Sequence, residues 1–299
     1  MSERRGRALL GWVAPMHVEP LYRIANVTSP NSIEDFRQAS TKARHAKPAA
    51  SPLAAGASSS PSELVGPGLA SALQLVDSPL YKRVYAPMRA LGVRAVPLIS
   101  HVCPQWWIDD EYINELADGL PEQGNEADLF GFCFRRGSVD HPIVQGPLQN
   151  RAYLVGFSSR DRSLDAPGVA PSFVTVSDDR IDVTFSVEAR PNHIMIAPIE
   201  GTDRLLILNG VHRLFALLRA GRDRALCILL PPVNVNQPFA GIDFANNPEF
   251  FGPAELLSPQ PPYLRHFLDS GHSLPVSLRE LVQTMRVALV PEIGFVPRT

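Results

Sequence analysis

The segment around residue 210 constrains the fold more than any other part of the sequence. An apolar run of strand length, 205–208, ends at Asn209 and Gly210, and a helical pattern follows immediately. The apolar residues of that pattern share one helical face: Val211, Leu214, Phe215 and Leu218. The sequence therefore predicts a buried strand that passes through a glycine turn into an amphipathic helix, which ends at Gly221.

The first turn of this helix is a candidate anion site. Backbone N–H groups have no partners within the helix there, and the helix dipole is positive. A cation is unfavourable at that end unless an anion is near, so the position of Arg213 favours a bound anion. We therefore predict a phosphate-binding site formed by Asn209, Gly210, Val211, His212 and Arg213. The competing interpretation is a half-buried His212 that bonds a neighbouring carbonyl and an Arg213 that pairs with a surface carboxylate.

The turn resembles the signature of the ParB/sulfiredoxin superfamily, in which a strand, a Gly-x-His-Arg or Gly-x-Arg-Arg turn and a helix follow one another. Neighbouring segments extend the resemblance. They are a preceding strand at 193–198, a following strand at 225–230, and an opening strand and helix at 93–99 and 110–117. The resemblance implies an α/β (α+β) fold with a ParB/sulfiredoxin-like core and nucleotide binding. A long insertion separates the two blocks.

The turn departs from the family pattern immediately before His212. Val211 occupies the place of the catalytic cysteine of sulfiredoxins, of the acidic residue of ParB proteins and of the first histidine of ParB-like small-molecule kinases. Asn209 stands where those kinases have an aspartate. Only Gly210, His212 and Arg213 match, so the resemblance implies the anion-holding residues without a full catalytic set.

A second segment that could carry chemistry is 106–111, Trp-Trp-Ile-Asp-Asp-Glu. The tryptophans could stack on a nucleobase, and an acidic residue could bind magnesium or act as a base. ParB-like kinases draw their acidic residue from this part of the fold, so the resemblance supports this hypothesis. The alternative is a tryptophan pair in the core and interface, with Asp109 or Asp110 capping the next helix. The catalytic hypothesis names Asp109, Asp110, Glu111 and His212, with ATP or CTP and magnesium as cofactors.

Composition limits the remaining classes. The chain has 299 residues, 45% of them hydrophobic, and a formal net charge of −2, which argues against a nucleic-acid partner. No apolar run approaches the roughly 18 residues of a membrane span, so no membrane partner is expected. The three cysteines have no metal or disulfide spacing, which predicts a cytoplasmic protein without a metal site. We expect Cys227 to be buried and Cys103 to be partly exposed.

Four regions are expected along the chain. They are an N-terminal extension at 1–28 with a short strand at 21–24, a flexible low-complexity linker at 29–68, a ParB/sulfiredoxin-like domain at 69–232, and an irregular Pro-rich wrap with a C-terminal helix at 233–299. The linker has few apolar anchors, so we predict disorder at 47–61. Expected helices are 69–91, with a break near its prolines, and 275–289, capped by Ser277.

A β-rich insertion is expected at about 120–190, within the third region. Its predicted strands are 128–134, 152–157, 173–176 and 181–187, and the last two form a hairpin. The basic group Arg219, Arg222 and Arg224 is typical of a helix C-terminus, where cations are favoured.

The favoured function is binding of a phosphate-bearing small molecule, in the first place a nucleotide, at the turn around Gly210. Phosphoryl transfer or nucleotide hydrolysis by a ParB-like enzyme is left open, as are the substrate and the oligomeric state. The first alternative is a non-catalytic protein-interaction module on the same fold. The second alternative is a partition-like DNA-binding protein.

Overall fold

The chain divides into two units, each described separately. Unit 1 comprises residues 1–135 and 193–279, and unit 2 comprises residues 136–192 and 280–299. The computed structural model describes residues 4–24, 32–46, 61–64, 67–98, 101–134, 193–239, 242–247 and 249–278. It also describes the backbone of the segments 144–147, 152–158, 162–165, 173–177, 181–184, 188–191 and 282–288.

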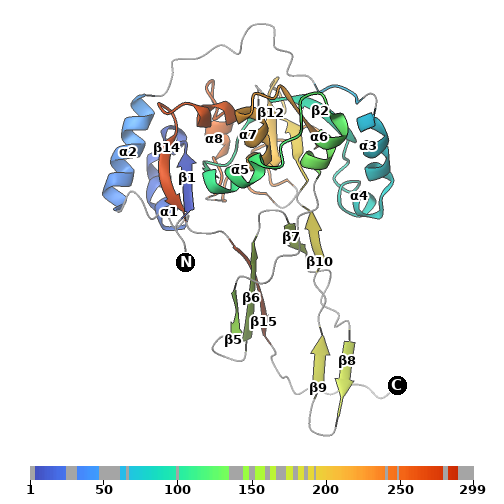
Figure 1. Cartoon of the computed structure of the whole chain (residues 1–299). Helices are drawn as coiled ribbons and strands as arrows, with labels where there is room; N and C mark the ends of the chain where they lie inside the picture. The colour runs from blue at the N-terminus through green and yellow to red at the C-terminus, as the bar shows by residue number, and fades with distance from the viewer. Residues whose placement is uncertain are drawn as a thin grey trace. The chain divides into compact units, whose positions relative to one another are not determined.

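A mixed sheet forms the centre of unit 1 (Figure 1). Among the described residues its five strands are β2 (Val93–Pro97), β13 (Arg224–Leu229), β11 (Met195–Pro198), β12 (Leu205–Asn209) and β3 (His101–Val102), in this spatial order. β11 is parallel to β13 and antiparallel to β12, and β12 is parallel to β3. The first four residues of β12 are all buried, which explains their unbroken apolar run.

Helices cover this sheet and its edges. The described helices are α1 (Val18–Ile24), α2 (Ile33–His45), α3 (Pro67–Asp77), α4 (Pro79–Val84), α5 (Asp110–Ala117), α6 (Glu126–Cys133), α7 (Val211–Arg219) and α8 (Pro253–Leu256). Short 3₁₀ turns lie at Leu10–Trp12, Pro15–His17 and Leu264–Leu268. In Figure 1, α1 and α2 lie at one end of unit 1, and α3, α4 and α6 lie at the other. The predicted strand–turn–helix at β12 and α7 is confirmed, as are the strands at β2, β11 and β13 and the helix α5.

A second sheet of unit 1 joins the first and last strands of this unit to the strand that leads into the acidic turn, residues 109–111. Its strands are β14 (Leu274–Leu278), β1 (Arg4–Ala8) and β4 (Trp107–Asp109), in this order and all antiparallel. The region expected to be an N-terminal extension thus contributes a strand, β1, that pairs on both of its sides. The predicted helix at 275–289, with its Ser277 cap, is also wrong. At 275–278, pairing with β1 outweighs the helical pattern, and Pro275 lies on an edge strand, where its missing N–H costs little. Residues 282–288 form the strand β15 (Val282–Ala288) of unit 2.

Three further segments differ from the sequence prediction. Residues 21–24 belong to α1, whose Val18 and Leu21 are buried with helical spacing. Part of the predicted linker is helix α2, which begins at the Ser32 cap and buries Phe36. The expected strand at 128–134 is helix α6, because Asn125 caps it through a bond from the Asp128 N–H to Asn125 Oδ1 at 3.1 Å. The segment 47–60 lies outside the described residues.

Unit 2 is built from antiparallel strands. They are β5 (Val144–Pro147), β6 (Ala152–Ser158), β7 (Arg162–Asp165), β8 (Phe173–Val176), β9 (Ile181–Thr184), β10 (Glu188–Pro191) and β15 (Val282–Ala288). β6 pairs with β5 and, in all seven positions, with β15, while β7 pairs with β10. β8 pairs with β9, which confirms the pairing expected of the predicted hairpin. The β-rich insertion thus recruits a strand from the C-terminal region.

The apolar core of unit 1 runs through the central sheet, α7 and the second sheet. Cys227 is fully buried, as predicted, and Cys103 is also fully buried, so its predicted partial exposure is wrong. Burial raises the pKa of the Cys103 thiol to about 12, which makes it unreactive. Among the helices that the structure describes, none has the length and apolar composition needed to cross a lipid bilayer.

Candidate functional site

Gly210 forms the turn between β12 and α7 and so sets the direction of the helix. Its φ of +90° lies in the left-handed region, and a Cβ at this position would lie 2.7 Å from Ile194 Cγ1. Two independent constraints, the backbone conformation and the close approach of Ile194 just before β11, therefore require glycine. Asn209 ends β12 and accepts the Gly210 N–H on its side-chain Oδ1 at 2.8 Å. Asn209, Gly210 and His212 all retain some exposed surface.

The N-terminus of α7 lacks the side-chain cap and acidic residues that usually balance the positive end of a helix. This nine-residue helix has no side-chain cap and no acidic residue in its first turn. By contrast, α2, α5 and α6 each have a side-chain cap and at least two acidic residues in the first turn. The backbone N–H groups of Val211 and His212 have no partner among the described residues. The first turn of α7 thus presents donors and a positive dipole without a negative group from its own helix.

His212 connects two elements of the site and adds no positive charge to it. Its Nε2 accepts the backbone N–H of Asp109 at 3.0 Å, so this ring nitrogen carries no proton. Burial and the charge of Arg213 lower the pKa of His212 to about 4, so the imidazole is neutral at physiological pH. The rings of Trp107 and Tyr112 flank it at centroid distances of 5.9 and 5.4 Å. His212 therefore connects α7 to the start of α5, but through a backbone donor and not the carbonyl of the competing interpretation.

Arg213 lies inside the protein. Only 4% of its surface is exposed, and its Nη1 donates to the backbone carbonyl of Cys133 at 2.6 Å. Cys133 is the last residue of α6, so the guanidinium lies at the negative end of that helix. Arg213 therefore has a structural role that the sequence did not reveal. Its positive charge nevertheless helps to lower the pKa of the neighbouring His212.

The acidic turn adjoins His212, as the catalytic hypothesis requires. Each of its carboxylates also has a partner within unit 1. Asp109 caps α5, with its Oδ1 accepting the Tyr112 N–H at 2.9 Å. Asp110 Oδ2 lies 2.9 Å from Arg7 Nε, and Glu111 Oε1 accepts the Arg5 N–H at 3.3 Å. The structure thus brings Asp109 beside the predicted phosphate site, while all three carboxylates also stabilise the start of α5.

The tertiary structure also shows which other residues lie around the turn. Trp106 is buried in the core, whereas Trp107 is partly exposed beside His212. Tyr112 and Ile194 were not assigned to the site from the sequence. Tyr112 follows the Asp109 cap by three residues, and this spacing could have assigned it to the site. No sequence signal marks Ile194.

In the described part of the chain, no group of three or more His, Cys, Asp or Glu side chains is placed to hold a metal ion. Magnesium usually reaches nucleotide sites through substrate phosphates and one or two carboxylates.

The three basic residues at the far end of α7 all have protein partners. Arg219 donates to Asn114 Oδ1 at 2.9 Å, and Arg222 donates to the backbone carbonyl of Pro121. Arg224 forms an ion pair with Glu126. These contacts attach the C-terminal end of α7 and the start of β13 to α5, α6 and the connection between them.

Comparison with known proteins adds no assignment: no protein-family model, curated protein or solved structure matches the chain. The relationship to the ParB/sulfiredoxin superfamily therefore stays a prediction from the residues of the turn and its neighbouring strands. The structure supports the coarser statement that the chain has a mixed α/β fold.

Proposed function

We propose that the chain binds a phosphate-bearing small molecule, in the first place a nucleotide, at the N-terminus of α7. The observation that carries the proposal is the combination of an uncapped first turn without acidic residues and the unpartnered N–H groups of Val211 and His212. A phosphate placed there would accept these donors and complement the helix dipole. The buried charge of Arg213 adds to the positive potential at the same turn.

A nucleotide suits the surroundings better than inorganic phosphate alone. Trp107 is partly exposed and lies against His212, so an aromatic surface adjoins the first turn of α7. A nucleobase gains about 1–3 kcal/mol from stacking on an aromatic side chain. The proposal accordingly assigns phosphate contacts to the backbone of α7 and base stacking to Trp107.

The test uses two substitutions at His212 that differ by one charge. His212→Glu places a carboxylate in the first turn of α7, whereas His212→Gln is neutral and keeps an acceptor for the Asp109 N–H. The proposal predicts that wild type and His212→Gln are stabilised thermally by ATP or CTP with magnesium. It predicts that His212→Glu is not, because the new carboxylate competes with phosphate for the same donors. Equal ligand stabilisation of both variants would contradict the proposal, as would its absence in wild type.

Phosphoryl transfer is a second candidate, and the proximity of Asp109 to His212 favours it. A base must lie within hydrogen-bond reach of the group that it deprotonates, and Asp109 is the acidic residue whose backbone contacts His212. Asp109→Asn tests this step, because asparagine also caps helices and therefore preserves the start of α5. Loss of turnover with unchanged nucleotide affinity would support a catalytic carboxylate. Unchanged turnover would exclude Asp109 as the base, and binding without turnover in wild type would favour the non-catalytic module.

A further inference from the structure

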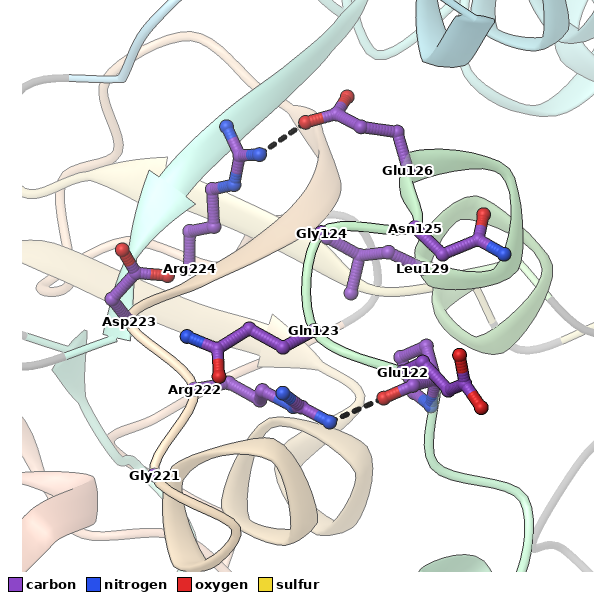
Figure 2. Close-up of a pocket in the computed structure, with 11 residues that line it drawn as sticks. Glu122, Gln123, Gly124, Asn125, Glu126, Leu129, Gly221, Arg222, Asp223 and Arg224 are labelled. Carbon is purple, nitrogen blue, oxygen red and sulfur yellow. Dashed lines mark hydrogen bonds and ion pairs between the residues drawn. The ribbon is translucent and has the colours of Figure 1, made fainter.

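A polar pocket of about 360 Å³ opens at the other end of α7 (Figure 2). One wall is the turn at 221–224 that leads from α7 into β13, and the other is the connection at 121–126 that leads into α6. Buried Pro121 and Leu129 supply its apolar part. Its volume lies within the range of about 300–1,000 Å³ typical of small-molecule sites. α7 rises about 1.5 Å per residue over nine residues, so this pocket is separate from the Gly210 turn.

The charges of the pocket do not suit a polyanion. Two arginines and three carboxylates line it, and Arg224 and Glu126 form an ion pair that neutralises both (Figure 2). The carboxylates of Asp223 and Glu122 have no hydrogen-bond or ion-pair partner among the described residues, and both residues are exposed. In Figure 2 these two carboxylates lie on opposite sides of Arg222, so a cationic group could bind at one of them, while a triphosphate would be repelled by both.

Arg222 supplies the opposite charge. One terminal nitrogen donates to the Pro121 carbonyl, but its Nε–H is buried and has no acceptor among the described residues. A buried donor without an acceptor is unfavourable by about 1–3 kcal/mol, and a ligand oxygen would remove that penalty. Gln123 lies beside Arg222 in Figure 2 and is exposed, and no hydrogen bond among the described residues holds its side chain. Arg222 itself is half-buried, so part of its side chain remains exposed where it lines the pocket.

We infer that this pocket binds a small zwitterion of about dipeptide size, with its ammonium group at Asp223 and its carboxylate at Arg222. Both charges are needed, because an amine alone leaves the Arg222 donor unsatisfied and a carboxylate alone faces two acidic groups. The inference is independent of the phosphate site at Gly210. Each site can therefore be present without the other.

The experiment titrates the full chain with three matched probes by calorimetry: dialanine, N-acetyl-dialanine and dialaninamide. The acetyl form lacks the ammonium group, and the amide lacks the carboxylate. The inference predicts that dialanine binds at least about tenfold more tightly than either capped form, since each charged contact contributes a factor of that order. It is overturned if dialanine does not bind, or if a capped form binds equally well.

Two variants locate the binding. Asp223→Asn removes one carboxylate from an exposed side chain. It should lower the affinity for dialanine by about tenfold without altering thermal stability. Arg222→Gln removes the cation, and if it fails to fold, Asp223→Asn decides alone. Arg219→Gln is the control, because Arg219 contacts Asn114 outside the pocket and should leave affinity unchanged. Dialanine affinity unchanged in Asp223→Asn would place the binding elsewhere and overturn the inference.

Discussion

Replacing Arg213 with alanine should destabilise unit 1 severely. The guanidinium is 4% exposed and donates to the last carbonyl of α6 at 2.6 Å. A hydrogen bond to a charged group contributes about 1.5–3 kcal/mol, and a partly buried cation at a helix C-terminus contributes up to about 2 kcal/mol. We therefore expect Arg213→Ala to lower the free energy of unfolding by about 2–5 kcal/mol. At about 2–4 °C per kcal/mol, the melting temperature should fall by roughly 4–20 °C.

Tryptophan fluorescence is the appropriate assay, because all three tryptophans, at positions 12, 106 and 107, belong to unit 1. Arg219→Ala is the matched control, since it removes an exposed arginine from the same helix and should cost no more than about 0.5 kcal/mol. A melting temperature for Arg213→Ala within about 2 °C of the control would refute the role assigned to Arg213 at the end of α6.

Two further predictions concern buried histidines and the glycine turn. Burial lowers the pKa of His101 and His212 to about 4, so the unfolded chain takes up their protons first as the pH falls. The free energy of unfolding should therefore decline as the pH falls from about 6.5 to 4. His101→Leu should make the urea midpoint less dependent on pH in this range. A pH dependence equal to that of wild type would contradict the role of His101. Gly210→Ala should lower the free energy of unfolding, measured in urea, by about 1–3 kcal/mol more than Gly221→Ala does. Both glycines have positive φ, but only at Gly210 would a Cβ meet Ile194; equal losses would refute this contact.

The elements that the sequence predicted correctly are those whose patterns are local. The run 205–208 is buried on both faces of a sheet, and the Gly210 conformation ends it, so strand, turn and helix all leave local signals. The acidic turn behaves similarly, because an N-cap such as Asp109 is defined by its own helix. These features required no knowledge of the rest of the chain.

The errors arise where distant pairing decides the structure. Residues 275–278 have a helical pattern but form an edge strand on β1, and no local signal announces a partner some 270 residues away in the sequence. The apolar run 128–134 fits strand and helix equally well by composition, and the Asn125 cap decides for the helix. The structural role of Arg213 likewise depends on α6, which reaches it only in the folded chain.

The most direct measurement of the phosphate site is the change in backbone amide NMR shifts when ATP or CTP with magnesium is added to the full chain. An anion bound at the start of α7 accepts hydrogen bonds from the backbone of that turn, so the amides of Gly210, Val211, His212 and Arg213 should move most. The Trp107 indole signal should move with them if the base stacks there. Shifts that leave 210–213 unchanged would contradict the proposed site.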